Sequence, residues 1–401
     1  MHILTLTTLF PNSLQPVHGV FIRNRMESFT RKYGLAWTVL APVPYFPRIP
    51  IAPRAIYRVY ARVPALEEPW GYPIHHPRYL VTPKLGMRFY GSWMAEAVRR
   101  TVLEIHRKRP IDVIDCHYVY PDGTAGIRMG RELGIPVILS ARGTDLSLYP
   151  RFPAIRPRIQ RNLEACQHLI CVCSDLQTRA VELGTPPEKT SVIGNGVDVQ
   201  LFRKGDRGEA RRKLGLPPTG RILLSVGHLT ARKGFHLVLE AFAGLRDQDL
   251  FLVIAGEGEE KERLAKQAER LGIHSRVVFP GAVLNRDLPD WYSAADLFVL
   301  ASSREGWPNV LCEAQAIGLP VVANRGWGGV PEIIDHPSLG ILVEERNVEA
   351  LRAALDRALQ TRWDNTQIEE RGRSRTWDQV SEKLLPVFQR ALEGREHPYN
   401  D

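Results

Sequence analysis

Two series of short apolar, β-branched runs divide the 401-residue chain, and helical patterns separate most of them. Strands that alternate with helices form parallel, doubly wound sheets. We therefore predict an α/β protein with two Rossmann-like domains, whose ligands are expected beyond the carboxyl ends of the strands, in the cleft between the domains. The runs lie near residues 2–8, 36–43, 112–119, 136–141, 168–173 and 190–193 in the first half, and near 221–227, 250–255, 276–283, 297–301, 320–323 and 340–343 in the second.

The length also favours two domains, which we place at residues 1–195 and 196–375. The charged and proline-containing segment Val197–Gly220 is predicted to be a linker, and residues 45–83 are predicted to be a long loop excursion. Residues 376–394 carry apolar side chains at three- or four-residue spacing, which predicts an amphipathic helix. These side chains are Trp377, Val380, Leu384, Phe388 and Leu392.

Composition indicates a globular, intracellular protein. Apolar residues make up 44% and charged residues 24% of the chain, no apolar stretch approaches the roughly 20 residues of a membrane span, and the N-terminus lacks the features of a signal peptide. The five cysteines have neither zinc-site nor redox spacing. They are expected to be buried, reduced thiols, so we expect a cytoplasmic location.

The basic residues are concentrated in the first half. Residues 1–195 contain 25 Lys/Arg and 14 Asp/Glu, a net charge of 25 − 14 = +11, which leaves (53 − 25) − (44 − 14) = −2 for the rest. No nucleic-acid-binding motif accompanies this excess. An anionic membrane surface, with a peripheral location on its inner face, or a phosphorylated lipid acceptor fits it better, and a merely solvated basic face fits it equally well.

The most informative motif surrounds two glutamates, Glu305 and Glu313. The apolar run 297–300 predicts a buried strand before Glu305, and Pro308 suits the first position of a helix that carries Glu313. The start of such a helix attracts phosphate. The two carboxylates can therefore hold the two ends of a ligand whose phosphates lie at the helix start, which is the shape of a nucleotide sugar.

The segment E-G-x-P-N-V-L-x-E-A at 305–314 resembles the signature of the retaining glycosyltransferases of family 4, which have the GT-B fold. The resemblance implies that Glu305 binds donor-sugar hydroxyls and that Glu313 binds the ribose. It also implies that the diphosphate rests near the N–H groups of the helix start. The residues expected there are Gly306 on the turn, Asn309 and Val310.

A second segment, 227–234, resembles the family's G-R-x-x-x-x-K-G loop, which grips the donor diphosphate. Lys233 matches the lysine, whereas His228 replaces the usual arginine. Arg232 can restore the lost charge, or a protonated His228 can donate to phosphate, although histidine does not reproduce the arginine fork. Gly256 is expected to line the pocket for the base, and Gly328 belongs to a segment like the family's G-G-x-x-E.

In the first domain the resemblance assigns His117, at the end of a strand, to orienting the donor sugar or stabilising the developing positive charge. Gly19 opens the first helix and can let the backbone approach the diphosphate. Arg142 replaces the histidine of an H-G-x-D-like segment that ends in Asp145, and we expect both residues on the acceptor side.

No metal or cofactor is expected. Asp247-Gln248-Asp249 matches the D-x-D by which other glycosyltransferases hold a divalent cation. It precedes a strand, however, and the binding edge follows the strands, so we interpret it as a solvated loop. Enzymes of the GT-B fold generally need no metal.

We therefore expect a metal-independent, retaining hexosyltransferase-type enzyme that moves a sugar from a nucleoside-diphosphate sugar to a glycan or lipid-linked acceptor. A sugar-nucleotide epimerase of the GT-B fold is one alternative. A non-catalytic nucleotide-sugar-binding partner is another, supported by His228 in place of arginine. A membrane adaptor is a third.

Overall fold

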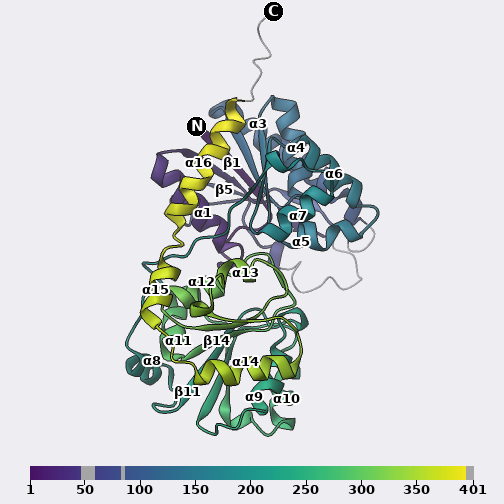
Figure 1. Ribbon diagram of the computed structural model, residues 1–401. Helices are drawn as coiled ribbons and strands as arrows, with labels where there is room; N and C mark the ends of the chain where they lie inside the picture. The colour runs from purple at the N-terminus through teal and green to yellow at the C-terminus, as the bar shows by residue number, and fades with distance from the viewer. Residues whose placement is uncertain (47–58, 83–85, 394–401) are drawn as a thin grey trace, which may run out of the picture. The chain divides into compact units, whose positions relative to one another are not determined.

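The computed structural model describes residues 1–46, 59–82 and 86–393, and the chain divides into two compact units (Figure 1). Unit 1 contains Met1–Asn195 together with Trp377–Asp401, and unit 2 contains Gly196–Thr376. Each unit is built on a mostly parallel sheet with helices against it, as the alternating sequence pattern predicts. Both units are therefore Rossmann-like. No helix in the described ranges is long and apolar enough to cross a bilayer.

The sheet of unit 1 has eight strands in the order β10-β9-β8-β7-β1-β2-β5-β4, and only the pairing of β4 with β5 is antiparallel. The six expected strands are all present. They are β1 (His2–Thr7), β2 (Ala36–Leu40), β7 (Val113–His117), β8 (Val137–Ala141), β9 (His168–Cys171) and β10 (Thr190–Val192).

Residues 45–83, predicted to be a loop, contribute to this sheet within their described part. β5 (Ile74–His75) extends it beside β2, and β4 (Leu66–Glu67) forms its edge. A separate pair is formed by β3 (Val43–Tyr45) and β6 (Arg78–Leu80). These strands are only two or three residues long, so they give no alternating pattern in the sequence.

Helices cover both faces of the unit 1 sheet. α4 (Asp122–Leu133) packs closely on one face, where a Cβ atom at Gly126 would lie 2.1 Å from Sγ of Cys116. On the other face, alternate residues of β7, including Val113, pack in a hydrophobic cluster with residues of α1 (Val20–Tyr33). The remaining helices are η1 (Met87–Phe89), α3 (Tyr90–Lys108), α5 (Thr144–Ser147), η2 (Tyr149–Arg151), α6 (Arg156–Ala165), α7 (Ser174–Glu182) and η3 (Pro187–Lys189).

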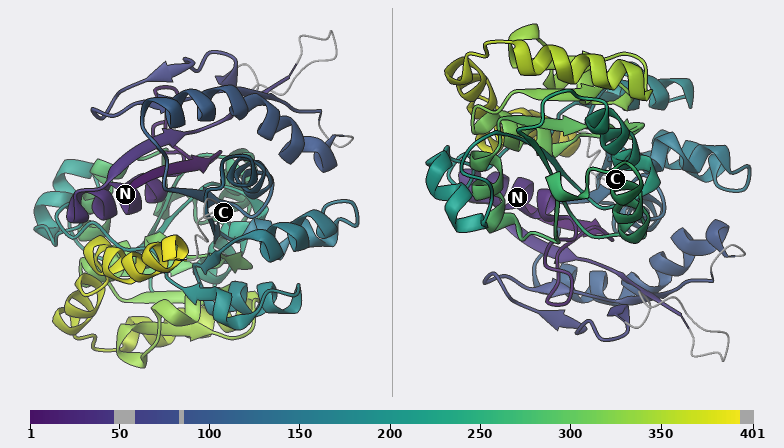
Figure 2. Two further views of the ribbon diagram at one scale, coloured as in Figure 1. Left: turned by 90° about the horizontal axis from the view of Figure 1, so that it is seen from above. Right: turned by 90° about the horizontal axis from the view of Figure 1, so that it is seen from below.

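The last helix, α16 (Trp377–Glu393), returns to unit 1 and lies along α1 (Figures 1 and 2). Its apolar stripe joins the cluster on the Val113 face of the sheet, and the rings of Phe388 and Phe29 are 4.9 Å apart. Polar contacts border the stripe: the hydroxyl of Ser28 donates to Asp378 at 2.9 Å. The C-terminal helix therefore completes the core of the unit in which the chain begins.

The sheet of unit 2 has six parallel strands in the order β13-β12-β11-β14-β16-β18. They are β11 (Arg221–Val226), β12 (Leu250–Ala255), β13 (Val277–Gly281), β14 (Leu297–Leu300), β16 (Val321–Asn324) and β18 (Gly340–Val343), which agree with the six expected strands. Two hydrophobic clusters lie on the two faces of this sheet.

Eight α-helices surround the sheet of unit 2 (Figure 1). They are α8 (Arg207–Leu214), α9 (Phe235–Ala243), α10 (Lys261–Arg270), α11 (Leu288–Ala294), α12 (Asn309–Ala316), α13 (Val330–Ile333), α14 (Val348–Gln360) and α15 (Asn365–Arg373). The 3₁₀ turns are η4 (Ala231–Lys233), η5 (His274–Arg276), η6 (Asn285–Asp287) and η7 (Pro337–Leu339).

The segment Val197–Gly220, predicted to be a linker, is instead a folded part of unit 2. It contains α8, whose Arg211 is 4% exposed and lies 2.7 Å from Asp296. Because surface charges hide the apolar contacts of α8, its sequence has the appearance of a linker. All five cysteines are buried, as expected.

Candidate active site

The centre of the candidate site in unit 2 is the ion pair of Glu305 with Lys233. Glu305 lies in β15 (Arg304–Glu305), just beyond the carboxyl end of β14, and Lys233 lies in η4 on the loop that follows β11. Lys233 Nζ is 2.6 Å from Glu305 Oε1, and Arg232 Nη1 is 3.4 Å from Oε2. The structure thus brings together the two motifs that the sequence predicts for the sugar and the diphosphate.

Glu305 remains ionised although it is only 9% exposed. Burial raises the pKa of the carboxyl, but the charges of Lys233 and Arg232 outweigh that effect and hold its pKa below the ordinary value. Two cations against one carboxylate leave a surplus positive charge at this point. The cluster can therefore accept an anionic group without losing its internal ion pair.

The backbone near Glu305 is fixed by a second short strand. β15 pairs in parallel with β17 (Trp327–Gly328), and Glu305 lies opposite Gly328. A Cβ atom at Gly328 would lie 1.6 Å from the carbonyl oxygen of Glu305, so no other residue fits at this position. Gly328, in the G-G-x-x-E segment, therefore fixes the backbone position of Glu305.

Glu313 occupies a different environment inside α12. Its Oε2 accepts a hydrogen bond of 2.8 Å from the hydroxyl of Tyr292, a buried residue of α11. Burial raises the pKa of Glu313 to about 7, although the Tyr292 hydrogen bond opposes this rise. The two glutamates of the motif thus have pKa values displaced in opposite directions.

The other residues expected to bind the donor lie at the same edge of the sheet. Asn309 and Val310 form the first turn of α12, whose N-cap is Pro308. The helix thus begins one residue later than predicted, which is within the usual variation of a helix end. The carbonyl of Gly306 accepts from the amide of Gly329 at 3.2 Å.

Two residues that are expected to contact the donor lie on the loops that follow β11 and β12. His228 is exposed on the loop after β11, at the position where the family has arginine. Gly256 directly follows β12, and its amide donates to the carbonyl of Gly281 at 2.8 Å. Both residues therefore lie beyond the carboxyl ends of their strands, at the binding edge of this sheet.

His117, the candidate in unit 1, is fully buried at the end of β7. Its Nδ1 accepts a hydrogen bond of 2.5 Å from Arg142 Nη2, and its Nε2 lies 2.9 Å from Oδ2 of Asp115. Because a guanidinium only donates, the ring carries its proton on Nε2. Within the described part of the chain only Nδ1 is hydrogen-bonded, because the approach of Nε2 to Asp115 does not have hydrogen-bond geometry. The ring is nevertheless fully buried, so a contact between the ring and a sugar requires that a neighbouring residue first moves away.

Burial keeps His117 neutral. It is the main cause that lowers the pKa of the ring to about 4; the charge of Asp115 opposes this shift, and the charge of Arg142 adds to it. Burial raises the pKa of Asp115, but the neighbouring His117 ring and the charges of Arg25 and Arg142 outweigh burial and lower it. This end of the unit 1 sheet therefore contains a buried cluster of two arginines, one carboxylate and one imidazole.

Arg142 and Asp145, predicted to face an acceptor, have internal roles in the structure. Arg142 also donates to the side chain of Asn195 at 3.0 Å, and it is 8% exposed. Asp145 accepts from the backbone amides of Gly143 at 2.8 Å and Val119 at 3.0 Å. The two side chains hold together the loops that follow β7 and β8.

Arg25 extends this cluster from α1. It is 1% exposed, and none of its guanidinium nitrogens has a hydrogen-bond partner within residues 1–46, 59–82 and 86–393. Burial lowers its pKa, and the Asp115 charge opposes the shift. The sequence signal for Arg25 is its place among the buried positions of α1, beside Ile22 and Met26, where a charged residue is unusual. No pattern pointed to Tyr292.

Gly19 begins α1 in the left-handed conformation, with φ of 67°. A Cβ atom there would lie 2.2 Å from the carbonyl oxygen of Leu9, so glycine is required for this close turn. Beside this turn, a cavity of about 190 Å³ opens beyond the carboxyl ends of β1 and β2. Its polar lining consists of Thr8, Asn12, Gln15, His18, Tyr60, His76 and Tyr79.

The D-x-D segment lies between α9 and β12. Asp247 Oδ2 accepts from Arg221 at 2.6 Å, and Asp247 Oδ1 accepts from the amide of Asp249 at 2.9 Å. These contacts give the segment a structural role in a turn. Within the part of the chain that the structure describes, no three histidine, cysteine or acidic side chains gather as a metal site.

Two family models match the chain. The model described as Glycosyltransferase Family 4 covers residues 52–201, and the model described as Glycosyl transferases group 1 covers residues 206–375. The first match lies in unit 1, except for its last residues, and the second lies in unit 2. The second contains Lys233, Glu305 and Glu313.

Known proteins are similar to this chain over most of its length. TuaC of Bacillus subtilis, a glycosyltransferase assigned to teichuronic acid biosynthesis, is 30% identical over 92% of this chain and 90% of its own. D-inositol 3-phosphate glycosyltransferase 1 of Catenulispora acidiphila is 30% identical over 71% of this chain and 73% of its own. The fold matches HepE of Anabaena, solved in complex with UDP, with a TM-score of 0.73 at 20% identity over 97% and 100% of the two chains.

Proposed function

The chain belongs to the family 4 glycosyltransferases of the GT-B fold, and we propose that it transfers a sugar from a nucleoside-diphosphate sugar with retention of the anomeric configuration. The observation that carries this proposal is the cluster of Lys233, Arg232 and Glu305 beside the start of α12. It offers a surplus positive charge where a diphosphate leaving group develops its charge. The structure of HepE with UDP supports a nucleotide donor.

Each residue has a specific task in this proposal. Lys233 and Arg232 bind the diphosphate and stabilise it as it leaves, and His228 lies on the same loop. Glu305 binds hydroxyls of the transferred sugar, and its ionised state makes it a strong hydrogen-bond acceptor. Glu313 binds the ribose. The acceptor attacks from the face on which the diphosphate departs, which is how the configuration is retained, and no metal takes part.

His117 is proposed to orient the donor sugar or to stabilise the developing positive charge. Its neutral state suits the second task, because a protonated ring would repel that charge. Arg142 and Asp145 then fix the ring and the neighbouring loop, and through them influence the acceptor side. Gly19 permits the turn that lies beside the 190 Å³ cavity, which we propose for part of the acceptor.

The proposed acceptor is a lipid-linked or polysaccharide precursor. The role of TuaC in teichuronic acid biosynthesis supports a glycan acceptor, and the basic first half of the chain supports an anionic one. We place the enzyme in the cytoplasm, peripherally on the inner face of the membrane.

Incubation with the donor alone and with candidate acceptors, followed by NMR of the products, tests the reaction class. A transferase requires an acceptor for turnover and gives a glycoside with the anomeric configuration of the donor. Accumulation of an epimeric nucleotide sugar without acceptor would instead identify an epimerase. Normal donor binding without turnover on any acceptor would identify a non-catalytic partner.

A further inference from the structure

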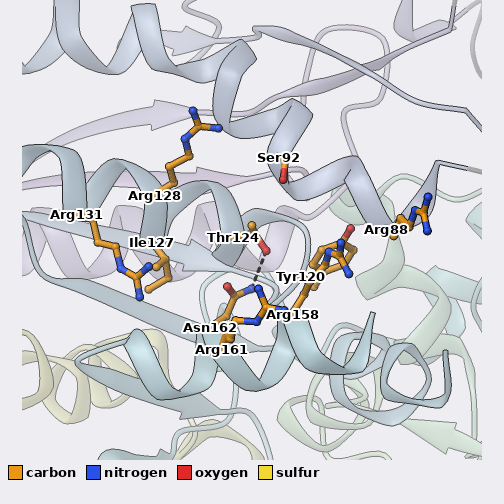
Figure 3. Close-up of a pocket in the computed structure, with 10 residues that line it drawn as sticks. All are labelled: Arg88, Ser92, Tyr120, Thr124, Ile127, Arg128, Arg131, Arg158, Arg161 and Asn162. Atoms are coloured by element: carbon orange, nitrogen blue, oxygen red, sulfur yellow. Dashed lines mark hydrogen bonds between the residues drawn. The ribbon is translucent and has the colours of Figure 1, made fainter. Parts of the chain in front are cut away.

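A pocket of about 360 Å³ on unit 1 is lined by five arginines and by no acidic residue within the described part of the chain (Figure 3). Three separate stretches of chain build it: η1 with the start of α3, the segment from Tyr120 through α4, and α6. Figure 3 shows Arg131 and Arg88 at opposite ends of the pocket, with the side chains of α6 between them. The complete lining is Arg88, Ser92, Tyr120, Thr124, Ile127, Arg128, Arg131, Arg158, Arg161 and Asn162.

Most of these arginines have no counter-charge. Arg128 lies 3.4 Å from Glu96, whereas Arg88, Arg131, Arg158 and Arg161 have no carboxylate within 4.0 Å among the described residues. Arginines elsewhere on α3 differ: Arg99 pairs with Glu132 and Arg100 pairs with Glu104. Four arginines without an acidic partner in the described part of the chain therefore lie around one pocket.

Hydrogen bonds connect the uncharged residues of the pocket wall. Asn162 is 5% exposed, and its amide donates to the carbonyl of Val119 and to the hydroxyl of Thr124, both at 2.8 Å. The hydroxyl of Tyr120 donates to the carbonyl of Met87. These bonds connect η1, α4 and α6, so the arginines are carried on elements that are held together. The positions from which the arginine side chains extend are therefore fixed relative to one another.

A guanidinium group donates hydrogen bonds and never accepts them. The partner of this pocket must therefore present several acceptor oxygens and negative charge. Phosphate meets both conditions and matches the arginine fork in two places at once. The volume exceeds that of one phosphate group, which leaves room for the group that carries it.

We propose that this arginine pocket is a phosphate-binding site, separate from the donor's diphosphate site in unit 2. Its ligand is a molecule that carries a phosphate or diphosphate group, arriving either free in solution or on a lipid-linked precursor. Tyr120 and Thr124, which line the pocket, belong to the segment that follows His117 in the chain, so a phosphate bound here would lie against the segment that also carries the unit 1 candidate. If the function proposed above holds, this ligand is the acceptor.

Calorimetric titration with inorganic pyrophosphate tests the site, and every variant carries Lys233→Ala so that the donor site does not contribute. The added pair Arg131→Gln/Arg161→Gln is expected to weaken binding at least tenfold. Both side chains are exposed and lack an acidic partner in the described ranges, so the fold is expected to tolerate the change. The matched control, Arg107→Gln/Arg109→Gln, removes the same charge from exposed positions outside the pocket and is expected to change affinity less than twofold.

Equal weakening by both pairs would show that only the overall charge matters and would overturn the proposal, as would undiminished binding by the pocket pair. Co-sedimentation with phosphatidylglycerol or phosphatidylcholine vesicles separates the sources. Pyrophosphate binding that the pocket pair abolishes supports the site. Loss of binding to phosphatidylglycerol vesicles in the same variant would then assign the phosphate to a lipid, and vesicle binding equal to that of the control would assign it to a soluble molecule. Loss of vesicle binding alone, with pyrophosphate affinity unchanged, would assign the arginines to a membrane surface. A separate comparison tests the donor site: equal pyrophosphate binding by wild type and by Lys233→Ala alone would show that Lys233 does not bind a diphosphate.

Discussion

Lys233 and Glu305, which are 72 positions apart in the sequence, form an ion pair with a distance of 2.6 Å between Nζ and Oε1. The pair joins the loop after β11 to the turn before α12, so two motifs that the sequence shows separately become one site. Lys233 is already ordered by Glu305 before any donor binds. A diphosphate therefore meets a preorganised cation rather than a mobile surface lysine.

Replacement of Lys233 by alanine is expected to lower both donor affinity and stability. The change leaves Glu305 buried with only Arg232, at 3.4 Å, so the free energy of unfolding should fall by about 1–3 kcal/mol. Donor affinity should fall at least tenfold because a charge on the diphosphate is lost. Urea unfolding and calorimetry measure the two effects. Lys261→Ala, which breaks the exposed pair with Glu257, is the control and should change neither by a comparable amount.

The raised pKa of Glu313 predicts a pH-dependent stability. The folded carboxyl has a pKa of about 7, against about 4.3 in an unfolded chain, so it favours folding below the lower value and loses that contribution as the pH rises through 7. Glu313→Gln should therefore be more stable than wild type at pH 8, by up to about 3 kcal/mol, and equal to it near pH 4. The same variant should bind donor more weakly.

Denaturant unfolding of wild type and Glu313→Gln at several pH values measures this difference. Tyr292→Phe provides a companion variant, because it removes the hydrogen bond that lowers the pKa of Glu313. In that variant the loss of stability should move to higher pH. A stability difference between wild type and Glu313→Gln that stays constant from pH 4 to pH 8 would disprove the raised pKa.

The neutral state of His117 predicts that its ring does not titrate between pH 5 and pH 9. Its pKa is about 4, to which the charge of Arg142 contributes after burial. Arg142→Gln removes that charge and should raise the pKa of His117, while activity falls because the ring loses its fixed orientation. Histidine NMR titration, with His117→Gln to identify the signal, measures the shift. A wild-type His117 signal that titrates near pH 6.5 would contradict the buried arrangement.

The final helix is expected to be essential to unit 1. Phe388→Ala removes a ring packed 4.9 Å from Phe29 and should lower the free energy of unfolding by about 3–5 kcal/mol. Gln389→Ala changes the neighbouring exposed position and should have an effect below about 0.5 kcal/mol. Chemical denaturation of the full chain compares the two. Similar small effects from both would show that α16 does not belong to the core.

The sequence predicted the sheets well because buried parallel strands are short continuous apolar runs. All twelve expected strands occur, and the stripe from Trp377 to Leu392 forms α16 as predicted. The prediction that Val197–Gly220 is a linker was wrong, because most residues of α8 are charged and lie on the surface. The partner of Arg211, Asp296, lies 85 residues later in the chain. Pairs at such separations leave no local pattern.

The candidate site, too, was predictable from the sequence only in part. The family motif located Glu305, Glu313 and Lys233, and the contact of Lys233 with Glu305 then follows from the topology of the sheet. The sequence does not show the surroundings of each side chain. Tyr292, on another helix, donates a hydrogen bond to Glu313, and Arg142 donates one to Nδ1 of His117. Such side-chain contacts depend on tertiary packing, which periodicity and spacing do not encode.

Calorimetric titration of UDP-, GDP- and ADP-sugars into wild type, Lys233→Ala and Lys261→Ala tests the central claim most directly. We predict that one nucleotide sugar binds wild type, that Lys233→Ala weakens it at least tenfold, and that Lys261→Ala leaves it within twofold. Binding of no nucleotide sugar to wild type, or equal affinity in wild type and Lys233→Ala, would contradict the proposed donor site.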